Sequence, residues 1–229
     1  MNSNYTHIAV IIDRSGSMAD IATDVIGGFN QFLSDQRNVK TNHATLSLVQ
    51  FDTMNPFEVI HDFRTLPAIE PLNANTYQPR GGTPLLDAVG YGIVNLDERL
   101  TQMRDHERPG QILFLIITDG EENASRQYSH RAIRDLIAAR TEQGWQFVYL
   151  SADLDAFADS DRIGIAESHK MAFDKTGRGT RDAFADLSFN ISETRYGRKS
   201  RAQAFFEESQ RAKYELEQRR RGDDSNSGN

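Results

Sequence analysis

The chain has 229 residues, a formal net charge of −7, 38% hydrophobic and 26% charged residues, and no cysteine. This composition is typical of a folded globular protein and excludes a disordered or fibrous one. The acidic balance argues against a nucleic-acid partner, and the lack of cysteine excludes disulfide frameworks and thiolate metal sites. The apolar run from Ile8 to Ile12 is too short for a signal-peptide core or a membrane span. We therefore expect a cytoplasmic protein that does not bind a membrane.

Strand-like and helix-like segments alternate along the chain. The strongest strand predictions are residues 7–13, 45–51, 111–118 and 145–151. Three of these are nearly continuous apolar runs, which is typical of parallel strands covered on both faces. Residues 57–64 alternate apolar and polar side chains and follow a turn-like segment, which predicts a hairpin to an antiparallel edge strand.

Three helices are predicted between these strands. The first carries an apolar stripe at helical spacing, formed by Ile21, Val25, Phe29, Phe32 and Leu33. The second begins with Thr83 as N-cap and Pro84 in the first turn, and continues to Leu100. The third covers residues 128–143. A short strand near 171–173 and a helix near 180–191 complete the layer.

This order predicts an α/β, doubly wound, Rossmann-like fold with a mostly parallel central sheet, one antiparallel edge strand and helices on both faces. We expect one domain over residues 1–196. The charged remainder, 197–229, is predicted to be a helical arm with a weak apolar stripe (Ala202, Phe205, Phe206, Ala212 and Leu216) and a flexible polar tail. Its adjacent phenylalanines can dock on the domain's own surface, on a partner or on a second copy of the chain.

Hard oxygen ligands gather where the predicted strands end. Asp13, Ser15 and Ser17 follow the first strand at alternate positions, and Asp119 follows the strand 111–118. Thr83 stands at a helix start behind two glycines. Ligands bind outside the carboxyl ends of parallel strands, and Mg²⁺ takes oxygen ligands that include only one or two carboxylates. Two aspartates and three hydroxyls therefore predict one Mg²⁺ site, with Mn²⁺ or Ca²⁺ as possible replacements.

These motifs, Asp13-x-Ser15-x-Ser17, Gly82-Thr83-Pro84-Leu85 and Thr118-Asp119-Gly120, resemble the metal-ion-dependent adhesion site of von Willebrand factor A domains. The resemblance covers roughly residues 5–195 and is to the bacterial or phage intracellular type. It implies that Ser15, Ser17 and Thr83 coordinate the metal, with Asp13 and Asp119 acting partly through water. It further implies a non-enzymatic protein-binding module, whose cation is completed by an Asp or Glu carboxylate of the partner. An AAA+ ATPase or a component of a phage or stress system is the kind of partner that the resemblance suggests.

Two other functions are compatible with parts of the pattern. A Mg²⁺-dependent phosphoryl-transfer enzyme would use Asp13 as nucleophile. Such phosphatases carry a second carboxylate where this chain has Ser15, and they need a later lysine for which the sequence offers no clear candidate. A metal-free interaction scaffold is the other alternative, and the intact ligand set argues against it. Arg14 is interpreted either as a rim charge that attracts an acidic partner or as a solvated side chain.

Overall fold

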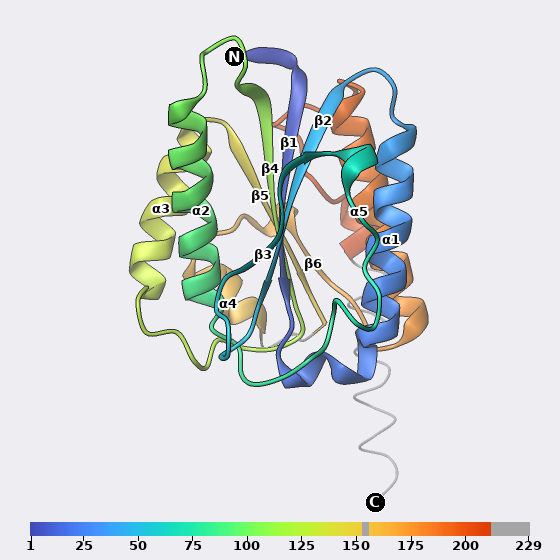
Figure 1. Ribbon diagram of the computed structural model, residues 1–229, viewed down its shortest axis with the longest axis vertical. Helices are drawn as coiled ribbons and strands as arrows, with labels where there is room; N and C mark the ends of the chain where they lie inside the picture. Colours follow the sequence, from blue (N-terminus) through green and yellow to red (C-terminus); the bar gives the residue numbers. More distant parts are fainter. Residues whose placement is uncertain (153–155, 212–229) are drawn as a thin grey trace, which may run out of the picture.

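A six-stranded sheet forms the centre of the molecule (Figure 1). The computed structural model describes residues 1–152 and 156–211. The strand order is β3-β2-β1-β4-β5-β6. The strands are β1 (Asn2–Asp13), β2 (His43–Phe51), β3 (Glu58–Thr65), β4 (Pro109–Thr118), β5 (Trp145–Ser151) and β6 (Lys170–Ala172). Only the β2–β3 pair among them is antiparallel. The predicted fold class is confirmed.

Helices cover both faces of the sheet (Figure 1). On one face, α1 (Ala22–Asn38) and α5 (Gly177–Arg195) pack on the sheet and on each other. On the other face lie α2 (Leu85–Gln102) and α3 (His130–Glu142), with α4 (Ala156–Arg162) beside α3. Each face has its own apolar core, because successive side chains of the central strands point to opposite sides. Along β1, Ile8, Val10 and Ile12 enter the first core, whereas Ala9 and Ile11 enter the second.

Several element boundaries differ from the sequence predictions. A 3-10 turn at Gly16–Ile21 precedes α1, and α4 was not predicted at all. The prediction that Thr83 is the N-cap of the second helix is wrong, because α2 begins at Leu85 and Pro84 occupies the cap. The backbone N–H of Thr83 is bound instead by Oδ1 of Asn123 at 2.9 Å. This leaves Thr83 in an extended loop in front of the helix.

The segment after α5 folds back onto the domain. Residues 198–207 form turns and bends, and residues 208–211, within the predicted helical arm, are helical. Phe205 and Phe206 are 1% and 0% exposed in the core shared by α1 and α5. The backbone N–H of Phe206 donates to the carbonyl of Ser168 at 2.9 Å. The pair therefore docks on its own domain. The boundary at residue 196 remains a prediction, and Ala212 and Leu216 lie outside the described residues.

Within residues 1–152 and 156–211, no helix combines the length and apolar character required to cross a bilayer.

Candidate metal centre

The five predicted ligands come from three loops at one edge of the sheet. Asp13 ends β1 and Asp119 directly follows β4. These strands are neighbours and parallel, so their carboxyl ends meet. Ser15 and Ser17 lie on the turn that leaves β1, and Thr83 lies on the loop that enters α2. The topology thus gathers residues that are more than 100 positions apart in the sequence.

Asp13 is fully buried and is held by two hydrogen bonds. Its Oδ1 accepts from the backbone N–H of Ser15 at 2.6 Å, and its Oδ2 accepts from the hydroxyl of Thr118 at 2.7 Å. Burial, with a smaller contribution from the neighbouring Asp119, raises the pKa of Asp13 to about 7 against the lowering effect of the hydrogen bonds from Thr118 and Ser15. A cation in this place would favour the ionised carboxylate, since it supplies the opposite charge that burial removes from water.

A chain of short contacts links the two serines to Asp119. The hydroxyls of Ser15 and Ser17 are 3.0 Å apart, and the hydroxyl of Ser17 donates to Oδ1 of Asp119 at 2.6 Å. Ser15 and Asp119 are buried, whereas Ser17 is exposed. The cluster therefore has one side open to solvent, from which a cation or a partner can approach.

The hydroxyl of Thr83 lies close to this cluster, beside Gly120. A β-carbon built on Gly120 would lie 3.3 Å from the hydroxyl of Ser17 and 3.6 Å from the hydroxyl of Thr83. Both hydroxyls thus border the space that a side chain at residue 120 would begin to fill. The glycine after Asp119 keeps this space open.

An ion-pair network beneath the site fixes two of the loops. Arg14 is 5% exposed and binds the buried Asp52 through Nε at 2.9 Å, and Arg80 binds the same carboxylate at 2.9 Å. Burial alone raises the pKa of Asp52, but hydrogen bonds from Asn55, Arg14 and Arg80 outweigh it and hold this pKa below its ordinary value. The loops also bond directly, since the N–H of Arg80 donates to the carbonyl of Arg14 at 2.8 Å. Both interpretations offered for Arg14 are wrong, because it is a buried structural cation.

The donor set fits a small divalent cation. Octahedral Mg²⁺ holds its oxygens at about 2.0–2.1 Å, so neighbouring ligand oxygens are about 2.9 Å apart. The 3.0 Å separation between the hydroxyls of Ser15 and Ser17 matches this geometry. Oδ2 of Asp119 is buried and accepts no hydrogen bond within the described residues, but it forms an ion pair with Nζ of Lys175 at 3.3 Å, which a cation would have to displace. No cluster of three or more His, Asp or Glu side chains suited to a metal occurs in that part of the chain. A metal ion bound here would therefore need the hydroxyls as ligands in addition to the two aspartates.

Lys175 was missed by the sequence reasoning. It lies between β6 and α5, and its Nζ is 3.3 Å from Oδ2 of Asp119. A lysine at this distance neutralises the carboxylate on which a cation would depend. Because β6 and α5 are distant from β4 in sequence, no local motif predicts the contact between Lys175 and Asp119.

Three further side chains, Tyr77, Asp87 and Glu122, organise the loops around the site. The buried hydroxyl of Tyr77 donates to the carbonyl of Asp13 at 2.6 Å, and burial raises the pKa of this phenol well above its ordinary value. Asp87 accepts from three successive backbone N–H groups, of residues 126–128. Glu122 accepts from the N–H groups of residues 86, 124 and 125. These bonds shape the loop after β4 and brace it against α2.

Comparisons with known proteins support the fold. No family model matches the sequence, and no curated protein matches it. Solved structures do match. The PilB minor pilin from Streptococcus sanguinis has a TM-score of 0.64 at 13% identity, covering 87% of this chain and 64% of that one. The vWF domain of the type V pili tip protein Mfa5 from Porphyromonas gingivalis has a TM-score of 0.57 at 10% identity, covering 87% and 98%.

A third similar structure contains a metal. Proximal thread matrix protein 1 from the mussel byssus, with a zinc-occupied MIDAS motif, has a TM-score of 0.55 at 13% identity, covering 83% of this chain and 46% of that one. This chain therefore spans less than two thirds of the PilB and mussel proteins. At these identities the likeness extends to the fold alone, which is that of a von Willebrand factor A domain.

Proposed function

We propose that this chain is a divalent-cation-dependent protein-binding module, and that the cation, Mg²⁺ by preference, is held by Asp13, Ser15, Ser17, Thr83 and Asp119. The observation that supports this most directly is the chain of contacts from Ser15 through the exposed Ser17 to Asp119, with the hydroxyl of Thr83 beside the same space at Gly120. The zinc-occupied MIDAS motif of the mussel protein supports the same reading, because that protein shares the fold.

The balance of charge in the ligand set favours a partner with an acidic side chain. Three of the five ligands are neutral hydroxyls, so a bound divalent cation retains attraction for an external carboxylate. Ser17 is exposed, which leaves the cation accessible from solvent. An Asp or Glu of a partner protein would then complete the coordination. The residues themselves would position the cation and exclude water from its inner side.

This binding could take place inside the cell or at the cell surface. Sequence resemblance suggests an intracellular partner such as an AAA+ ATPase or a phage or stress-system component. By their descriptions, however, two of the similar structures belong to pili. They support an adhesive role at a cell surface at least as well as a cytoplasmic one.

An enzymatic role is the rival, and Lys175 is the observation that favours it. Phosphatases that use an aspartate nucleophile need a lysine near their carboxylates, and the 3.3 Å contact between Lys175 and Asp119 supplies one. Against this, position 15 is a serine where such enzymes carry an acid. We therefore propose that the chain is not an enzyme. A panel of phosphate monoesters tests this point, because turnover in wild type that disappears in Asp13→Asn would establish phosphoryl transfer.

Affinity capture tests the binding function itself. The immobilised chain is exposed to extract in Mg²⁺ or in chelator, and Thr83→Ala is compared with Thr101→Ala, a substitution on the exposed end of α2 away from the site. We expect one partner to be retained in Mg²⁺ by wild type and Thr101→Ala, and lost in chelator or with Thr83→Ala. Replacing an acidic residue of the captured partner should abolish retention. A partner retained equally in chelator would contradict the proposal.

A further inference from the structure

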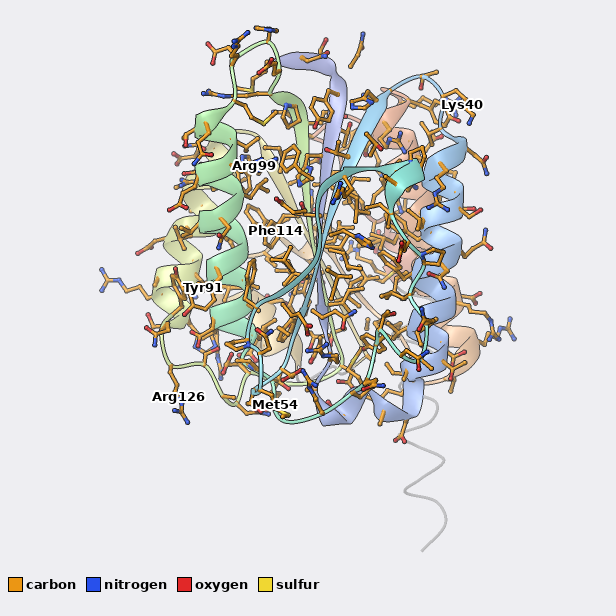
Figure 2. All side chains as sticks on the ribbon, viewed as in Figure 1. Lys40, Met54, Tyr91, Arg99, Phe114 and Arg126 are labelled. Atoms are coloured by element: carbon orange, nitrogen blue, oxygen red, sulfur yellow. The ribbon has the colours of Figure 1, made fainter. Side chains whose placement is uncertain are left out.

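Lys175 lies on a loop that leaves the same edge of the sheet as the candidate metal ligands. It follows β6, which runs parallel to β5, and precedes α5. Figure 2 shows Met54 and Arg126, from the loops after β2 and β4, at this lower edge of the molecule. The side chain of Lys175 is 40% exposed, whereas that of its ion-pair partner Asp119 is 0% exposed. The lysine therefore connects the buried carboxylate with the solvent side of the site.

The backbone on both sides of Lys175 is held in place. Phe173 and Asp174, directly before it, are 0% and 5% exposed. Directly after it, the hydroxyl of Thr176 caps α5 by accepting from the N–H of Gly179 at 3.1 Å. A β-carbon on Gly179 would lie 2.6 Å from Cβ of Asp174, so the first turn of α5 packs closely on this segment. The ammonium group therefore moves on its own flexible stem and stays within reach of the site.

A bound cation would compete with Lys175 for its partner. Within the described residues the only ion pair of Lys175 is the one with Oδ2 of Asp119, at 3.3 Å. That oxygen is buried and accepts no hydrogen bond in this part of the chain. A divalent cation held by Asp119 would repel the ammonium group. On cation binding, the lysine would thus have to exchange this carboxylate for water or for another acceptor.

The charges in direct contact indicate which acceptor fits. The carboxylates of Asp13 and Asp119 together balance a divalent cation, so Lys175 adds one uncompensated positive charge. The two arginines of the ion-pair network add none, because they pair with the carboxylates of residues 52 and 58. One external carboxylate would restore the balance. Its two oxygens can act separately, one as a ligand of the cation and the other as an acceptor for an ammonium group.

We propose that Lys175 is a second recognition group for the acidic side chain of the partner. It pairs with Asp119 in the absence of a cation. When a cation binds, Nζ transfers to the partner's carboxylate, which then spans the cation and the lysine. This inference rests on the proposed cation-dependent function. It adds that the partner's acid contacts two positive groups, so that an uncharged amide cannot replace it.

Acetate tests this contact in the full chain, as a probe for the partner's side chain, with acetamide as the uncharged comparison. Each protein is saturated with Mn²⁺ at constant ionic strength, and water proton relaxation reports the displacement of water from the cation. Wild type should bind acetate more tightly than acetamide. Lys175→Met should bind acetate about fivefold more weakly than wild type. The same variant should bind Mn²⁺ itself more tightly, because the ammonium group no longer competes for Asp119. A merely structural role of the lysine would not produce these opposite changes.

Arg178→Met is the matched control for a general effect of charge. It also removes a positive charge near the start of α5, but Arg178 is 83% exposed and its Nε lies 3.8 Å from Asp182. Its affinity for acetate should equal that of wild type. Equal losses in Lys175→Met and Arg178→Met, unchanged acetate binding in Lys175→Met, or equal affinities of wild type for acetate and acetamide would each overturn this inference and leave the cation site standing. Failure of wild type to bind Mn²⁺ would overturn the proposed function, and this inference with it.

Discussion

Asp13 should make the stability of the metal-free protein depend on pH. Burial raises its pKa from the ordinary 3.8 to about 7, so between these values the folded protein holds a proton that the unfolded chain has lost. The contribution of Asp13 to the free energy of unfolding is therefore fully present below pH 4 and is lost as pH rises through 7. A pKa difference of this size corresponds to about 4 kcal/mol.

His7 acts in the opposite direction over much of the same range. Burial lowers its pKa from 6.5 to about 3, so the unfolded chain binds the additional proton here. Its contribution is present above pH 6.5 and is lost as pH falls toward 3. The two effects nearly cancel between pH 4 and 6.5, and the pH profile of wild type alone would conceal both.

Urea unfolding of wild type and Asp13→Asn in chelator, from pH 4.5 to 8, separates the two effects because the variant retains His7. The difference in unfolding free energy between wild type and variant should fall by a few kcal/mol across this range. Saturating Mn²⁺ should stabilise wild type more at pH 8 than at pH 5, since protons compete with the cation for Asp13. Parallel pH profiles of the two proteins in chelator would refute the argument from burial.

Three other substitutions have defined outcomes. Lys175→Met should tighten Mn²⁺ binding about fivefold in calorimetry, because the ammonium no longer competes for Asp119; an unchanged affinity would mean that the lysine is displaced at no cost. Tyr77→Phe should lower the unfolding free energy by about 1–3 kcal/mol, since it leaves the carbonyl of Asp13 unpaired. Phe206→Ala should cost about 3–5 kcal/mol in urea unfolding; a loss below about 1 kcal/mol would show that the segment after α5 is an accessory.

Local patterns were sufficient to predict the sheet, and they also selected the candidate ligand residues, whose metal binding stays a prediction. The apolar runs of β1 and β4 mark strands buried on both faces, and the oxygen-bearing residues directly follow them. The start of α2 was misplaced because Thr83 followed by Pro84 satisfies the local rules for a cap. In the fold, Asn123 binds the N–H of Thr83 instead. That bond joins residues 40 positions apart, which a local rule does not consider.

Contacts between distant segments account for the other misses. Arg14 is buried against partners in β2, directly after β2 and in β3 that are distant in the sequence, namely Gln50, Asp52 and Glu58. Lys175 reaches Asp119 through the order of the strands, which the sequence pattern does not specify. The segment after α5 is rich in charged residues, and its two adjacent phenylalanines dock on the core, which is one of the alternatives that the sequence offered for them.

Titration of Mn²⁺ into the purified chain, followed by calorimetry at pH 8, tests the central claim most directly. Wild type and the control Thr101→Ala should each bind one Mn²⁺ with the same affinity. Thr83→Ala and Asp119→Asn should bind it at least about tenfold more weakly, because each removes an oxygen ligand or a charge from the cation. Identical isotherms for all four proteins would contradict the assignment of the metal centre.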